Sequence, residues 1–189
     1  MTITCYLPVF FGKVFPANKT EFALINGLAL GIFGFSSSII GGIISDVWEK
    51  KTYMIKSLIV IFGNLLSTPL LAIAVFSNNF WLSVLSASLM PLVSGAYFAP
   101  PVTMMQNTQS SEKIGLVLST QSLYNMICQS IAPIIFDILA IRLGAFQNPR
   151  IFGYLTLGFT CFGYIGSSWF YWKGGVEYKK IMEAKDRMR

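Results

Sequence analysis

The sequence predicts an all-α polytopic membrane protein, and three observations indicate this class. Of the 189 residues, 54% are hydrophobic and only 12% are charged, whereas soluble domains carry about 25% charged residues. The mean hydropathy of +0.62 excludes a disordered chain, which needs low hydrophobicity. The apolar residues also fall into long runs, and a run that crosses lipid must be helical because its backbone groups need internal partners.

The first three apolar runs cover residues 1–16, 22–48 and 53–76. The first contains Pro8 and has no charged leader before it, so we expect the last part of a span and not a signal peptide. The second and third exceed the roughly 20 residues that a spanning helix needs. A short polar turn separates each run from the next.

Three further runs, residues 80–105, 114–143 and 151–172, are also long enough to span. The first of these is rich in proline and glycine. After the last run the chain becomes polar, and residues 173–189 are predicted to form a charged tail in water. The prediction is therefore six transmembrane helices, the first one truncated, followed by this tail.

The Lys and Arg residues are distributed unevenly among the connections, which predicts the orientation of the chain. Ten of the fourteen lie in the second connection, the fourth connection and the tail region, and four lie in the other connections. We therefore expect a multi-pass protein with a cytoplasmic C-terminus. The net charge of +6 is explained by this topology, so we expect no nucleic-acid partner.

The second connection carries the sequence GGIISDVWEKK at residues 41–51. Gly42 and Asp46 lie on one helix face, where a small residue allows a neighbouring helix to approach closely. We expect Asp46 to contact the start of the fifth run, near residues 114–118, and expect Lys50 and Lys51 to pair with acids on moving helices. The alternative is a capped turn whose lysines only set the orientation.

This stretch resembles the signature loop of the major facilitator superfamily: Gly42, three residues, Asp46, then the basic pair Lys50 and Lys51. The resemblance extends to the six spans, the Pro-rich fourth run and Ala132-Pro133 in the fifth. Residues 99–115 look faintly like spinster-type or organic-anion members. The resemblance implies the C-terminal six-helix half, helices seven to twelve, of an alternating-access transporter, with an N-terminal six-helix half missing.

Neutral polar residues inside the runs are the candidates for a substrate cavity, because lipid cannot satisfy their amides. Gln121, Asn125 and Gln129 share one face of the fifth run. Asn26 and Asn64 are the corresponding candidates in the second and third runs. The alternative is that these amides form interhelical hydrogen bonds that only hold the bundle together.

Two functions follow from these patterns. The first is a secondary transporter, present as a fragment, that moves a small organic solute across a membrane. The second is a truncated relative without transport activity, or a structural subunit of a larger membrane complex. Because the chain has no His and its three Cys are far apart, we expect neither an enzyme nor a metal site nor a cofactor. The expected partners are a small-molecule substrate, the lipid bilayer, and the missing half or another membrane subunit.

Overall fold

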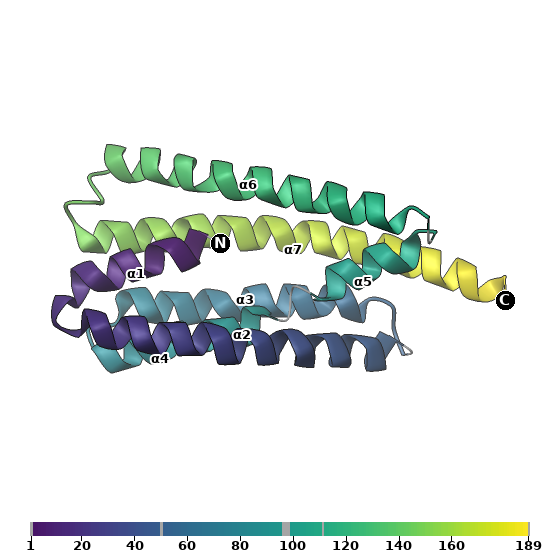
Figure 1. The fold of residues 1–189 in the computed structure, drawn as a ribbon, viewed down its shortest axis with the longest axis horizontal. Coiled ribbons are helices and arrows are strands. Elements are labelled where there is room, and N and C mark those ends of the chain that lie inside the picture. The colour runs from purple at the N-terminus through teal and green to yellow at the C-terminus, as the bar shows by residue number, and fades with distance from the viewer. Residues whose placement is uncertain (1, 50, 96–98, 111, 189) are drawn as a thin grey trace.

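The computed structural model describes residues 2–49, 51–95, 99–110 and 112–188, with the backbone alone for residues 2–5. Every regular element among these residues is helical (Figure 1). The elements are α1 (Thr2–Val14), a 3₁₀ turn η1 (Pro16–Asn18), α2 (Lys19–Glu49), α3 (Ile55–Phe76), α4 (Phe80–Ser94), α5 (Ala99–Thr108), α6 (Ile114–Arg142) and α7 (Pro149–Arg187). The predicted all-α class is confirmed.

Four stretches are long and apolar enough to cross a bilayer: Pro16–Glu49, Ile55–Phe76, Phe80–Thr108 and Ile114–Arg142. These stretches indicate a multi-pass membrane protein, as the hydropathy predicts. With 13 residues, α1 is shorter than a span. With 39 residues, α7 is about twice the length that a span needs, but its glycine and tyrosine residues and the charged residues of its second half lower its hydropathy.

The predicted fourth span is divided into two helices. One helix, α4, ends at Ser94 and the other, α5, begins at Ala99. Residues 96–98 between them lie outside the described residues, and the prolines on either side disfavour a continuous helix because proline lacks the backbone N–H that such a helix must donate. Pro91 lies in the last turn of α4, and Pro100 and Pro101 occupy the first turn of α5, the position in a helix where proline is tolerated.

The connections alternate between two ends of the bundle (Figure 1). At one end, which we call the aromatic end, lie the α1–α2, α3–α4 and α6–α7 connections. Here Phe11 stacks on Phe22 and Tyr6 stacks on Phe136, each with ring centroids 4.0 Å apart. At the other end, the polar end, lie the α2–α3 and α5–α6 connections and the end of α7.

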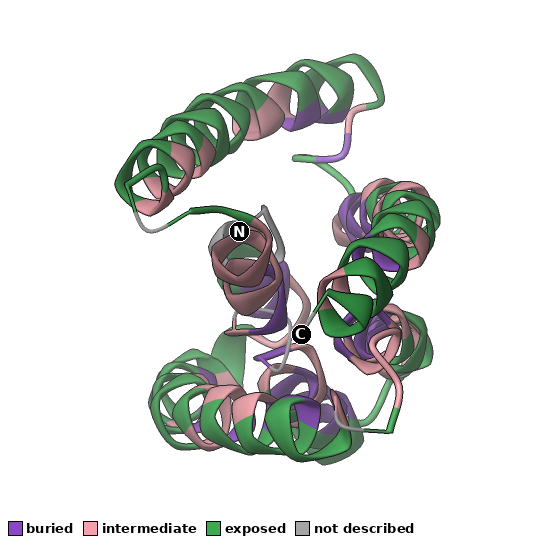
Figure 2. Ribbon diagram, turned by 90° about the vertical axis from the view of Figure 1, so that its right-hand side faces the viewer, coloured by how far each residue is buried: buried purple, intermediate pink, exposed green. Residues whose placement is uncertain are grey.

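The helix α6 is the least buried of the long helices (Figure 2). Its fully buried residues, Phe136 and Ala140, both lie near the aromatic end. Large apolar side chains along the rest of the helix, such as Leu123, Ile134 and Ile141, are exposed. Such a face needs lipid or a protein partner to cover it.

Candidate ion-pair network and central cavity

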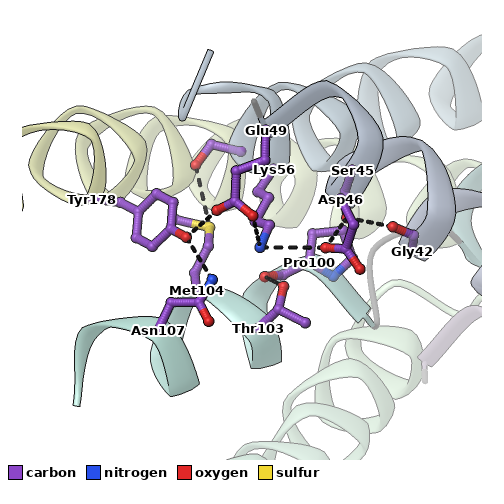
Figure 3. A network of polar contacts seen from close by, with 11 residues as sticks. Gly42, Ser45, Asp46, Glu49, Lys56, Pro100, Thr103, Met104, Asn107 and Tyr178 are labelled. Atoms are coloured by element: carbon purple, nitrogen blue, oxygen red, sulfur yellow. Dashed lines mark hydrogen bonds and ion pairs between the residues drawn. The ribbon is translucent and has the colours of Figure 1, made fainter. Parts of the chain in front are cut away.

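Lys56 is the centre of a polar network at the polar end (Figure 3). It lies in the first turn of α3 and is only 1% exposed. Its Nζ lies 2.8 Å from Glu49 Oε2 and 3.5 Å from Asp46 Oδ1. Because Asp46 and Glu49 are three residues apart at the end of α2, both carboxylates face the same side of that helix. The tight turn between α2 and α3 then brings Lys56 against them.

Tyr178 connects this ion pair to α7 and α5. Its hydroxyl donates to Glu49 Oε1 and accepts a hydrogen bond of 2.9 Å from Asn107 Nδ2. Burial, and then the hydrogen bond to Glu49, raise the pKa of Tyr178 above its usual value of 10.0. The hydroxyl therefore stays protonated and acts as a donor at neutral pH.

The last turns of α7 make two more contacts at this end. Lys185 Nζ donates to the backbone carbonyl of Asn107 at 2.7 Å, and the hydroxyl of Tyr53 donates to Asp186. The predicted tail is thus a continuation of α7 that packs on the polar end. The network fastens α2, α3, α5 and α7 together.

The structure places the predicted motif residues differently from the expectation. Asp46 pairs with Lys56 of α3 and is not at the start of α6, so the predicted contact with residues 114–118 is wrong. Gly42 faces α5, since a Cβ at this position would lie 3.5 Å from Ala99 Cβ. The physical reason is that α5 packs beside α2, and α6 then runs back along α7, away from α2 (Figure 1).

Of the motif's two lysines, Lys51 has no acidic partner among the described contacts. Lys51 Nζ lies 5.8 Å from the centre of the Trp48 ring, a distance that allows a cation–π contact. Lys50 lies outside the described residues. The pairing of these lysines with moving helices stays a prediction.

The sequence analysis missed the residues at the centre of the network: Glu49, Lys56, Asn107 and Tyr178. One signal was available. Asp46 and Glu49 share one face at the end of an apolar helix, so they need a nearby cation, and Lys56 is a lone charge at the start of the next apolar run. Nothing in the local sequence indicates Asn107 or Tyr178, which α5 and α7 bring from a distance.

A cavity of about 760 Å³ lies between α2, α3, α4 and α7, with Leu7 of α1 at its edge. Two predicted substrate-cavity residues, Asn26 and Asn64, line it. Asn64 lies about 14 Å along an α3 axis of about 33 Å, at 1.5 Å per residue, and so near the middle of the helix. The volume is in the range of about 300–1,000 Å³ that is typical of small-molecule sites.

The other predicted cavity residues lie elsewhere. Gln121, Asn125 and Gln129 are on α6, which contributes nothing to the lining of this cavity. Gln121 is half-buried, and Asn125 and Gln129 are exposed. The structure brings together the α2 and α3 candidates and leaves the α6 row apart. The assignment of that row to a substrate cavity stays a prediction.

Comparisons with known proteins find nothing similar: no family model, no curated protein and no solved structure matches this chain. Among the described residues, no group of three or more His, Cys, Asp and Glu is placed to hold a metal ion. The cavity and the polar network are therefore the features of this chain that bear on its function.

Proposed function

We propose that this chain is a six-helix half of a secondary transporter, of the major facilitator type, that moves a small organic solute by alternating access. The observation that carries the proposal is the cavity of about 760 Å³ at mid-depth of an apolar helical bundle. Transporters place their substrate sites near the bilayer midplane. Asn26 and Asn64, predicted from the sequence as cavity residues, both line it.

The polar network supports this proposal because alternating access needs contacts that hold one arrangement and can exchange. Lys56 has two carboxylate partners, the nearer Glu49 and the more distant Asp46. Asp46 is 62% exposed, so it remains in contact with water while Glu49 holds the cation. A small movement of α2 against α3 would exchange the two partners without leaving Lys56 unpaired.

In this proposal the polar end is cytoplasmic, as the excess of Lys and Arg at that end favours. A second six-helix unit covers α6, whose apolar side chains are exposed in this chain together with Asn125 and Gln129. The chain works without a cofactor and has no enzymatic activity. The same exposed helix favours the second candidate function, a non-transporting subunit of a larger membrane complex, because α6 would then be the docking helix.

Transport by the purified assembly separates the two functions. The tagged chain is isolated from its own membrane with its partners, reconstituted into liposomes and exposed to a mixture of small organic solutes, and the interior is analysed by mass spectrometry. We expect a second six-helix unit and saturable uptake of a subset of solutes. If the assembly takes up no solute faster than protein-free liposomes, the transporter function is contradicted. The second candidate, a non-transporting subunit of a membrane complex, then remains.

A further inference from the structure

The polar groups that line the central cavity are uncharged. Among the described residues of the lining they are the amides of Asn26 and Asn64 and the hydroxyls of serine, threonine and tyrosine residues. An ionised ligand without a counter-ion would lose its hydration on entering such a site, and nothing in the lining would compensate for that loss. The lining therefore selects against charged molecules.

The hydrogen bonds around Asn64 define which polar group the cavity offers. Ser167 Oγ donates to the backbone carbonyl of Tyr164 at 3.1 Å, so its single proton is used. Asn64 must then approach Ser167 with its NH₂ group, and Nδ2 lies 2.9 Å from Ser167 Oγ. Asn64 Oδ1 accepts no hydrogen bond from the described part of the chain. The amide thus presents an acceptor.

The hydroxyls nearby behave in the same way. Ser38 donates to the carbonyls of Gly34 and Gly95, and Thr160 donates to the carbonyl of Thr156. Their protons are engaged by helix backbone, and their free lone pairs are acceptors. The wall of the cavity around Asn64, Ser38 and Thr160 therefore presents acceptors, and a ligand that binds against this wall must bring the donor.

The rest of the lining is apolar and includes the aromatic rings of Phe35 and Phe159 and the flexible side chain of Met90. From these observations we propose that the cavity binds an uncharged amphipathic molecule with an aromatic or aliphatic body and an N–H or O–H donor at its polar end. Asn64 Oδ1 receives that donor. That this molecule is a transported substrate rests on the proposed function. That the cavity binds it does not, because binding is measurable without transport.

Two glycines of the lining allow the cavity to be filled without disturbing the helices. A Cβ at Gly163 of α7 or at Gly34 of α2 would meet no atom within 4 Å. Leucine at either position therefore extends into the open space. Gly158 of α7 and Gly31 of α2 are matched controls, since a Cβ there is equally free and neither residue lines the cavity.

The test uses three fluorescent probes of nearly the same shape, bound to the full chain in nanodiscs with empty nanodiscs subtracted. Dansylamide is neutral and has an N–H donor, N,N-dimethyl dansylamide is neutral without one, and dansylate is an anion. We expect dansylamide to bind about fivefold more tightly than its dimethyl analogue, the equivalent of one hydrogen bond. We expect dansylate to bind at least about tenfold more weakly than dansylamide, because its charge must be desolvated.

The variants locate the site. G163L and G34L should weaken dansylamide binding at least about tenfold by occupying its volume, while G158L and G31L leave it unchanged. Asn64→Ala should bring the affinities of dansylamide and its dimethyl analogue together. Should Asn64→Ala fail to fold, the leucine variants still decide the location.

Equal binding of dansylate and dansylamide overturns the proposed ligand class, and equal effects of G163L and G158L overturn the site. Failure of the class is distinguishable from failure of the transporter function. Saturable uptake of charged solutes by the reconstituted assembly would support the transporter function and refute the proposed class of uncharged ligands. Selective binding of dansylamide without uptake of any solute would support the proposed ligand class and refute the transporter function.

Discussion

Replacing Glu49 by glutamine removes the closest partner of a buried cation. Lys56 is 1% exposed and Glu49 is 17% exposed, with 2.8 Å between Nζ and Oε2. At an effective dielectric constant of about 20, the attraction over this distance is about 6 kcal/mol, and desolvation of the two ions offsets part of it. Breaking a buried pair by removing one partner destabilises by about 3–5 kcal/mol. We expect a loss near the lower value, because glutamine still accepts a hydrogen bond from Lys56.

Asp46→Asn is the matched control, since it makes the same chemical change one turn earlier on the same helix. Asp46 is 62% exposed and its carboxylate is 3.5 Å from Lys56 Nζ, so water screens the pair. Exposed pairs contribute about 0–1 kcal/mol. The free energy of unfolding, measured by reversible titration with SDS in mixed micelles, should therefore fall at least about twice as far for Glu49→Gln as for Asp46→Asn.

A rescue experiment tests the electrostatic explanation. In the Glu49→Gln background, Lys56 keeps only the more distant carboxylate of Asp46, and Lys56→Met replaces this poorly compensated buried cation by an apolar side chain of similar length. We expect stability to recover by about 1–3 kcal/mol, because the buried charge that has lost its closest partner is gone. The reasoning is refuted if Glu49→Gln and Asp46→Asn cost the same, or if Lys56→Met lowers stability further.

Three further predictions concern other parts of the molecule. The raised pKa of Tyr178 means that the folded chain retains this proton longer than the unfolded chain, so its contribution to stability is complete below pH 10 and is lost as the pH rises further. A pH titration of the unfolding free energy should show a larger loss in the wild type than in Tyr178→Phe, in which Tyr53, whose pKa is also raised, still contributes. A Cβ at Gly175 would lie 2.6 Å from Ser57 Cβ on α3, whereas a Cβ at Gly42 would make ordinary contact with Ala99 Cβ at 3.5 Å. Gly175→Ala should therefore lower the unfolding free energy by about 1–3 kcal/mol, and Gly42→Ala should lower it by less than half as much. Cysteines introduced at Thr52 and Asn78 of a Cys-free chain should be labelled from opposite sides of the membrane, and labelling of both from one side would contradict the proposed topology.

The sequence by itself determined the fold class and most of the helix boundaries. The predicted runs 53–76 and 114–143 agree within two residues with α3 (Ile55–Phe76) and α6 (Ile114–Arg142). This agreement has a local cause, because a segment that enters lipid must be apolar and internally hydrogen-bonded along its own length. Prolines are equally local in their effect, and those at residues 91, 100 and 101 disfavour a continuous helix through the fourth run, whose described parts are α4 and α5.

Only the tertiary structure decided which residues meet. Tyr178 donates to Glu49 across 129 positions of sequence, and Asn64 donates to Ser167 across 103. Asp46 was expected against α6, but the turn from α2 into α3 gives it Lys56 instead, and α5 is the helix that packs beside α2. Hydropathy specifies that a helix is buried in lipid or protein, but not which neighbour it has or how it is rotated. Those follow from side-chain packing between helices, which also determines that Asn26 and Asn64 share a cavity while the amides of α6 lie apart from it.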